Sequence, residues 1–366
     1  MTHYIHEHRD WPHFKWDAGL ADALSPLHHR LGHLLGQMGA LGSPFRDEAQ
    51  LRSLTLEITK NSEIEGEILA NDQVRSSIAR RLGLDVSDLV RPVRANRHVE
   101  GAVEILLDAT QNFNQPLTEE RLLDWHLSLF AASNRHLMIG RFRNDQEGPM
   151  QVVSGHYGRE RIHFEAPAAS RIPQEMAVFL AWFNAHLPLD PLLKAGIAHL
   201  WFVTLHPFDD GNGRLGRVIT DMQLAKADGS PGRFYSMSMQ IRAERKSYYE
   251  ILEKTQKNAL DITEWLAWFL ACLERALMAS ENLLADVLKK ARFWEMPETH
   301  SINERQRKML EKLLDHFEGK LTTSKWAKIS KCSEDTALRD IRDLVSRGIL
   351  VKGPAGGRST AWLLNI

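Results

Sequence analysis

The chain has very little cysteine, and this scarcity excludes two ways of building a site. Its 366 residues include two cysteines, Cys272 and Cys332, which belong to no motif and fall in different predicted domains. A disulfide framework needs paired cysteines, and a structural zinc site needs several ligands at short spacing. We therefore expect neither feature, and we expect both thiols to be reduced and buried.

Long apolar runs are also missing. No stretch approaches the roughly 18 apolar residues that cross a membrane, and the N-terminal sequence MTHYIHEHRDW lacks the apolar core of a signal peptide. With 43% hydrophobic and 25% charged residues, the composition is that of an ordinary globular protein. These features predict a cytoplasmic protein of two or three domains with no membrane partner.

The chain carries almost no net charge, −1 in total, but its charge is distributed unevenly. Residues 301 to 366 hold 13 lysines and arginines against 8 aspartates and glutamates, so the remainder of the chain is acidic. A basic terminal segment on an acidic body is a modest indication of a nucleic-acid partner at that end.

One stretch, HPFDDGNGRLGR from 206 to 217, combines the groups that bind a nucleoside triphosphate. Gly211 and Gly213 can adopt backbone angles that point successive N–H groups at one anion. A helix that begins there would add its positive dipole end. Arg214 and Arg217, three residues apart, would share one helix face and grip phosphate oxygens.

The same stretch also satisfies the dinucleotide pattern G-x-G-x-x-G through Gly211, Gly213 and Gly216. That fingerprint requires a β-strand directly before the first glycine. The preceding sequence PLLKAGIAHLWFVTLHPF has apolar residues over four helical turns and no earlier turn signal. It predicts a buried helix that ends in a loop, so we exclude a dinucleotide fold.

Two further residues of the stretch suit chemistry on phosphates. His206 can hold or release a proton near neutral pH. Asp210 offers a hard oxygen ligand for Mg²⁺ that arrives with the phosphates. The twelve residues therefore predict a site for a nucleoside triphosphate and Mg²⁺.

This stretch resembles the signature of the Fic family, H-x-F-x-[DE]-G-N-G-R-x-x-R, and matches every fixed position. The resemblance implies a helical core that transfers part of a nucleotide, usually AMP from ATP, to a protein hydroxyl. Carried over by position, it assigns the catalytic base to His206 and the Mg²⁺ ligand to Asp210. The phosphate-binding groups that it implies are Gly211, Asn212, Gly213, Arg214 and Arg217.

A second segment, NSEIEGE, matters because of a pattern in one class of the family. In that class an inhibitory helix ends in [ST]-x-x-x-E-[GN], and its glutamate pairs with the second signature arginine. Glu65 and Gly66 fit the end of this pattern, although Asn61 stands at its first position. A carboxylate and a phosphate compete for one guanidinium, so Glu65 would occupy the γ-phosphate position on Arg217. The alternative is a solvated stretch of glutamates.

Between Met138 and Pro173 the helical period lapses. Two β-prone pieces, Met150–Ser154 and Arg161–Glu165, flank Gly155 and Gly158 and predict a hairpin. The family resemblance implies a flap that holds the target protein as an added strand. The alternative is a hairpin that only caps a helical bundle.

Most of the remaining chain predicts helices, including all of residues 1 to about 95, Pro173–Leu187, Pro191–Leu205 and a helix that continues past Arg217 to Gly229. Tyr248 or Tyr249 would line an adenine pocket by stacking, or would pack in the core. We expect His199 to be a core or surface residue rather than a metal ligand.

Beyond Pro297 the pattern changes to three short helices, Asn303–Phe317, Thr323–Ser330 and one from Ser333 to Gly348, followed by two strands. This order resembles a winged helix-turn-helix module, whose third helix would enter a DNA groove. Its candidate DNA contacts are Thr336, Arg339, Arg342 and, on the wing, Arg358. Nearby aspartates, at 335, 340 and 343, favour the alternative of protein contacts or dimerisation.

The sequence therefore predicts a mainly α protein in three parts: an N-terminal helical domain at 1–97 with the inhibitory helix, a Fic-type bundle with a β-hairpin flap at 98–280, and a winged-helix module at 298–366. The predicted function is a protein adenylyltransferase that modifies a Ser, Thr or Tyr hydroxyl of a target protein or of itself, and that Glu65 inhibits. Three alternatives stay open: additional removal of AMP with water oriented by Glu65, a Fic-type phosphotransferase, and a DNA-binding regulator whose Fic domain senses ATP. A homodimer is a further candidate assembly.

Overall fold

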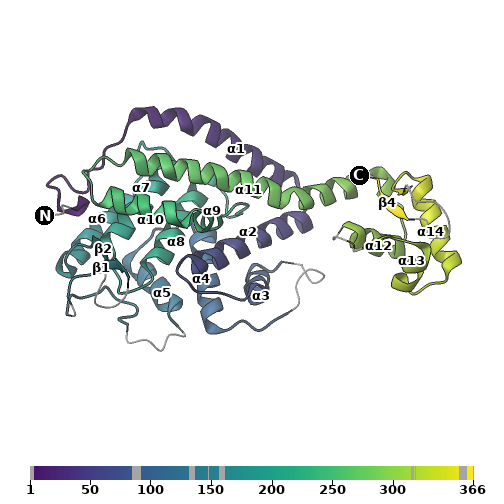
Figure 1. Ribbon diagram of the computed structural model, residues 1–366, viewed down its shortest axis with the longest axis horizontal. Helices are drawn as coiled ribbons and strands as arrows, with labels where there is room; N and C mark the ends of the chain where they lie inside the picture. Colours follow the sequence, from purple (N-terminus) through teal and green to yellow (C-terminus); the bar gives the residue numbers. More distant parts are fainter. Residues whose placement is uncertain are drawn as a thin grey trace. The chain divides into compact units, whose positions relative to one another are not determined.

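The computed structural model describes residues 4–84, 92–131, 137–146, 148–155, 161–314, 317, 319–353 and 361–365. Within these ranges the fold is mainly α-helical, as predicted (Figure 1). The chain divides into two compact units, Met1–Leu284 and Ala285–Ile366. None of the described helices is long and apolar enough to cross a lipid bilayer.

The prediction of helix throughout the first 95 residues is wrong for the opening segment. Residues 5 to 20 contain only two short 3-10 turns, Ile5–Glu7 and Ala18–Leu20, on either side of Pro12. Proline has no backbone N–H and therefore interrupts a helical ladder. The helices that follow are α1 (Ala21–Ala40), α2 (Ser43–Ile64) and α3 (Asn71–Leu82).

Helix α2 ends earlier than its sequence pattern indicates, at Ile64 rather than near Ala70. Gly66 has a φ of 84°, a left-handed conformation that favours glycine and stops the helix. The N–H of Glu67 then donates to Ser62 O at 3.0 Å, and the N–H of Gly66 donates to Glu63 O at 3.1 Å. This closed helix end sets the direction in which Glu65 and Glu67 leave the helix.

The centre of the larger unit is formed by two helices that pack closely against each other, α7 (Pro191–Leu205) and α8 (Asn212–Asp228). From Leu192 onwards every residue of α7 is buried, which confirms the predicted core helix. A Cβ at Gly216 would lie 2.8 Å from Val203 Cγ1, so the close approach of the two helices requires glycine there. Other helices surround this pair (Figure 1): α4 (Arg97–Gln111), α5 (Glu119–Leu129) and α6 (Ile172–Asn184).

The predicted hairpin is present. Strands β1 (Gln151–Ser154) and β2 (Arg161–Glu165) pair antiparallel, with an irregularity in register between Val152 and Val153. The turn between the strands, including Gly158, lies outside the described residues.

Three helices complete the larger unit or lead out of it. Helix α9 (Met237–Ala243) was not predicted; the Ser236 side chain caps it by accepting from Met239 N. Helix α10 (Arg245–Gln256) follows, and α11 (Thr263–Glu295) runs without a break across the division between the two units. The charged segment 281–295 is therefore the end of α11.

The smaller unit contains α12 (Glu304–Leu314), α13 (Thr323–Ser330), α14 (Glu334–Ser346) and the antiparallel pair β3 (Leu350–Lys352) and β4 (Trp362–Leu364). Trp326, Ile341 and Leu344 lie in its own apolar core. This element order follows the predicted one, whereas Arg358 lies outside the described residues. Both cysteines are free thiols; Cys272 is buried and Cys332 is half-buried.

Candidate functional site

The signature residues span the loop between α7 and α8 and the first turns of α8, and two of them have left-handed backbone angles. His206 ends α7 with a φ of 48°, and Gly211 precedes α8 with a φ of 84°. The buried Asn212 side chain holds this loop closed: its Oδ1 accepts from Phe208 N at 3.0 Å, and its Nδ2 donates to Phe208 O at 2.7 Å. Any contact of Asn212 with a phosphate would therefore use its backbone N–H.

The contacts of His206 determine where its ring can accept a proton. Its Nδ1 lies 3.2 Å from the Val203 carbonyl oxygen. A carbonyl only accepts, so Nδ1 carries the hydrogen and Nε2 keeps its lone pair. Burial lowers the pKa of His206 to about 4, and the nearby charge of Arg143 adds to this effect, although the bond to Val203 opposes it. The ring is therefore neutral at pH 7 and able to act as a base.

The turn before α8 has the geometry of an anion site. Leu215 is the first residue of the turn whose N–H bonds back along the helix, to Gly211 O at 3.0 Å. The preceding N–H groups lie at the positive end of the helix dipole. A Cβ on Gly211 would lie 2.9 Å from both Leu129 and Phe130, so this position tolerates only glycine.

Arg217 is buried, with 2% of its side chain exposed, and is bound from the end of α2. Its Nε donates to Asn61 Oδ1 at 2.7 Å, and its Nη2 donates to Glu65 Oε1 at 2.7 Å. Asn61, the departure from the family pattern, thus supplies a hydrogen-bond acceptor for the same arginine that Glu65 neutralises. Burial favours a raised pKa for Glu65, but the charge and hydrogen bond of Arg217 outweigh it, so the pKa is lower than usual.

Arg214 is also bound by a carboxylate, which the sequence reading did not foresee. Its Nη1 donates to Glu67 Oε2, while its guanidinium lies over the Phe130 ring at 5.0 Å. Arg214 is 3% exposed, and Glu67 also lies 3.1 Å from His98. The end of α2 therefore supplies one acidic partner to each signature arginine.

The carboxylate of Glu65 lies in the space that a side chain at position 213 would fill. A Cβ at position 213 would lie 2.2 Å from Glu65 Oε1, far inside contact distance. The absence of a side chain at this turn is therefore required for the carboxylate of Glu65 to reach Arg217.

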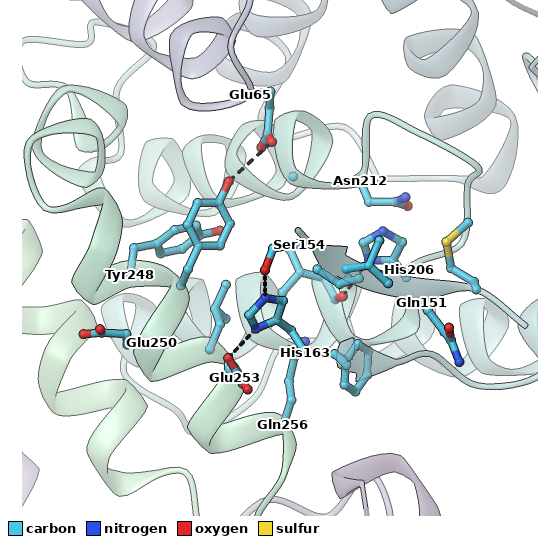
Figure 2. Close-up of a pocket in the computed structure, with 18 of the residues that line it drawn as sticks. Glu65, Gln151, Ser154, His163, His206, Asn212, Tyr248, Glu250, Glu253 and Gln256 are labelled. Atoms are coloured by element: carbon cyan, nitrogen blue, oxygen red, sulfur yellow. Dashed lines mark hydrogen bonds and ion pairs between the residues drawn. The ribbon is translucent and has the colours of Figure 1, made fainter. Parts of the chain in front are cut away.

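Glu65, His206 and the turn from Asp210 to Gly213 line a pocket of about 780 Å³, a size suited to a nucleotide. Figure 2 shows Glu65 at the top, His206 and Asn212 on the right, and side chains of the hairpin in the centre, with labelled side chains of α10 to the left and below. The Tyr249 hydroxyl lies 3.4 Å from Glu65 Oε2, whereas Tyr248 is buried and lies 2.8 Å from His199 Nε2. Of the two tyrosines, Tyr249 is therefore the one placed to contact an adenine ring. His199 is a core residue, one of the two positions expected for it.

A second histidine supports the loop, and the sequence reading missed it. His126 Nδ1 accepts from Gly140 N at 3.0 Å, so its Nε2 carries the hydrogen and donates to Asp210 O at 3.2 Å. The ring stacks on Phe208, with centroids 4.0 Å apart. A single histidine in helix α5 gives no sequence signal for this contact, which depends on the tertiary fold.

Buried carboxyl groups join α2 to α8 below the site. Glu57 Oε2 accepts from Ser236 Oγ at 2.7 Å and from Ser238 N at 3.0 Å. Its other oxygen faces Asp221, whose pKa burial raises well above its usual value, with the negative charge of Glu57 adding to the shift. Arg233 binds the far side of Asp221 at 2.7 Å. In its neutral form, which burial favours, Asp221 can donate a hydrogen bond to the facing oxygen of Glu57.

Residues 116–224 match the family model described as Fic/DOC family. The chain carries a Fic/DOC domain. The signature loop, α7 and most of α8 lie inside the matched range of this Fic/DOC domain, whereas Glu65 lies in residues 4–84, which match a domain of unknown function (DUF4172).

Sequence and fold relatives agree with this assignment of a Fic/DOC domain. The chain is 25% identical over 283 residues to the "Protein adenylyltransferase Fic" of Culex quinquefasciatus, covering 75% of this chain and 49% of that protein. It is 28% identical over 169 residues to the protein of the same name from Nematostella vectensis, covering 45% and 34%. The chain thus spans about half or less of these curated relatives. A crystal structure of a Fic family protein from Desulfovibrio desulfuricans G20 shares the fold, with a TM-score of 0.61, 18% identity and coverage of 96% and 98%.

The acidic groups of the Fic/DOC domain fit one kind of metal. Among the described residues, no cluster of three or more His, Cys, Asp or Glu side chains could hold an ion without other ligands. Mg²⁺ commonly takes one or two carboxylates and completes its shell with phosphates and waters. Asp210 lines the pocket beside the anion-binding turn, and its Oδ1 accepts from Gly211 N at 2.6 Å. Its position fits an ion that enters with a bound triphosphate.

Proposed function

We propose that this chain is a protein adenylyltransferase, which transfers AMP from ATP to a Ser, Thr or Tyr hydroxyl of a protein. The observation that carries the proposal is that a neutral histidine, a helix N-terminus and a carboxylate bound to a buried arginine line one pocket. The names of the relatives from Culex quinquefasciatus and Nematostella vectensis support the same reaction.

The proposed reaction assigns each group a step. The backbone N–H groups of Gly211, Asn212 and Gly213 hold the α-phosphate, and Arg214 and Arg217 bind the β- and γ-phosphates. The target hydroxyl attacks the α-phosphorus in line, the bond to the β-phosphate oxygen breaks, and pyrophosphate leaves. The hydroxyl proton passes to the lone pair on the catalytic histidine's Nε2.

Asp210 is the proposed ligand of Mg²⁺. The ion, when bound, would neutralise charge on the phosphates.

The proposal includes an inhibited ground state. Glu65 occupies Arg217 and Glu67 occupies Arg214, so both arginines are neutralised before a nucleotide arrives. The Glu65 side chain is 31% exposed, so solvent and a competing phosphate can reach it. A hydrogen bond to a charged group contributes about 1.5–3 kcal/mol, which corresponds to about 10- to 100-fold in nucleotide affinity.

A labelling experiment tests the reaction and the inhibition together. Wild type, Glu65→Gly and Glu65→Gln are incubated with Mg²⁺ and with ATP labelled at the α- or the γ-phosphate, with a cell lysate as target. Glu63→Gln is the matched control, because its carboxylate binds Lys60 and Arg242 rather than Arg217.

We expect label on protein from the α-position only, about 10- to 100-fold faster in both Glu65 variants than in wild type or the control. Label from the γ-position would identify a phosphotransferase instead. Label from neither position in any variant would contradict transfer and favour AMP removal or ATP sensing.

A second proposed function, DNA binding by residues 298–366, has one observation in its favour. Two of the aspartates that argue against DNA binding in the sequence are paired within the module. Asp340 binds Arg305 at 2.6 and 2.9 Å, and Asp343 binds Gln306 and Arg347. Arg339 and Arg342 remain exposed on α14.

A binding titration of the full chain with random duplex DNA at increasing salt concentrations tests this second function. We expect binding that weakens steeply as salt rises, because each phosphate contact releases counterions. A lack of binding at low salt would contradict DNA binding and leave protein contacts as the role of the module.

A further inference from the structure

A serine, a histidine and a glutamate from three different elements lie along one wall of the pocket. Ser154 Oγ on β1 is 2.5 Å from His163 Nε2 on β2, and His163 Nδ1 is 2.6 Å from Glu253 Oε2 on α10. All three line the same pocket as His206, and Figure 2 shows the two contacts as dashed lines.

The direction of each hydrogen bond follows from the groups themselves. An ionised carboxylate only accepts, so His163 Nδ1 carries a hydrogen and donates it to Glu253. The lone pair on Nε2 is then directed at Ser154, whose hydroxyl donates to it. A hydroxyl, an imidazole and a carboxylate in this order form the relay that activates serine nucleophiles.

Glu253 is held in its ionised form. Burial favours a raised pKa, but hydrogen bonds from Lys257, His163 and Arg161 outweigh it and lower the pKa of Glu253 to about 2. Lys257 Nζ lies 2.7 Å and Arg161 Nη2 lies 3.0 Å from Glu253 Oε1. The carboxylate can therefore stabilise His163 when the ring takes up a proton.

The other described hydroxyls of the pocket wall are less suited to attack a phosphate. Tyr249 donates to the Glu65 carboxylate, and Tyr248 is buried, with 1% exposed, against His199. Ser154 is exposed to the pocket and has a partly exposed imidazole as its acceptor.

We propose that Ser154 is a self-modification site, which accepts AMP from ATP bound in its own pocket. This inference rests on the proposed adenylyl transfer. The Ser154 oxygen bonds to the α-phosphorus, the bond from that phosphorus to the β-phosphate oxygen breaks, and pyrophosphate leaves. The serine proton passes to His163 Nε2 and from there to solvent.

The proposal limits the number of turnovers. Each chain has one Ser154, and the attached AMP stays tethered in the pocket that the next ATP must enter. Self-labelling at this serine therefore stops at one AMP per chain, and its rate per chain does not change on dilution.

The test follows label on residue 154 by intact mass and peptide mapping, in a Glu65→Gly background with Mg²⁺ and ATP. The variants are Ser154→Ala, Ser154→Thr and His163→Gln, and the control is Ser170→Ala, which removes an exposed serine outside the pocket wall. A lysate in parallel reactions reports transfer to other proteins.

We expect one AMP at residue 154, lost in Ser154→Ala, retained in Ser154→Thr and in the control, and formed about 100-fold more slowly in His163→Gln. Label on lysate proteins with none on residue 154 would overturn this inference and leave the proposed function intact. A labelling rate that rises with protein concentration would also overturn it, because the AMP would then come from another chain. No label on any protein would overturn both.

Discussion

Replacing Glu57 with glutamine should make the larger unit more resistant to unfolding above neutral pH. In the wild type, Glu57 and Asp221 face each other in the interior, and the negative charge of Glu57 adds to the effect of burial on the pKa of Asp221. Burial raises the pKa of Asp221, so folding binds a proton that the unfolded chain releases. The stability from this group is complete at low pH and is lost as pH rises through the pKa of the folded state.

The size of the effect follows from proton linkage. One proton bound on folding changes the free energy of unfolding by about 1.4 kcal/mol per pH unit. The loss runs from the ordinary pKa of an unfolded aspartate, about 3.9, up to the raised pKa of Asp221 in the folded state. Asp228, whose pKa burial raises to about 6, contributes a loss of the same sign below that value in wild type and variant alike.

The glutamine variant keeps every contact of the pair. Its carbonyl oxygen can accept from Ser236 and Ser238, as Glu57 Oε2 does, and its amide can donate permanently to Asp221. Burial, the largest cause of the raised pKa, remains in the variant, but the negative charge of Glu57 is gone. We therefore expect the loss of stability with rising pH to be smaller in Glu57→Gln than in wild type.

Urea unfolding followed by circular dichroism at several pH values measures this difference. Glu63→Gln is the matched control, the same chemical change on the same helix, and should follow the wild-type slope. An unchanged slope in Glu57→Gln, or a variant less stable than wild type at every pH, would show that the charge of Glu57 does not raise the pKa of Asp221.

The remaining predictions concern the site and the smaller unit. His206→Ala should abolish AMP transfer to other proteins and leave ATP binding within a few-fold of wild type by calorimetry; equal loss of both would contradict the role as base. Asn61→Ala should cost about 2 kcal/mol in urea unfolding, because it leaves a buried donor of Arg217 without its acceptor; a loss below about 0.5 kcal/mol would mean that water replaces the amide. The double variant Arg339→Ala and Arg342→Ala should lower the slope of log affinity for DNA against log salt by about 2, and an unchanged slope would place DNA elsewhere.

The sequence predicted helices best where the apolar pattern was long. Helix α7 has the bounds expected from its apolar run, and α13 has the bounds expected from the terminal pattern. Helix α2 ended early because a single left-handed glycine outweighs the helical propensity of the residues beyond it. Helix α9, with seven residues, is too short to show a period.

Within the site, predictability depended on sequence separation. The signature residues are contiguous, so their spacing could be read directly, and the pairing of Glu65 with Arg217 followed from a family pattern. Glu67, His126 and the Ser154–His163–Glu253 set could not be predicted, because each depends on helices or strands brought together by packing rather than by spacing.

The lack of a side chain at Gly213 limits which mutations can raise the activity. In the proposed function, the space that holds the Glu65 carboxylate also receives the phosphates of ATP, so a side chain there would displace both. A selection for hyperactive variants should therefore yield no hits at codon 213, and its hits should cluster at codons 61 to 67, where the inhibitory contact can be lost while the catalytic turn stays intact. In nature, too, heritable changes in the strength of the proposed inhibition would arise at the end of α2 rather than in the signature.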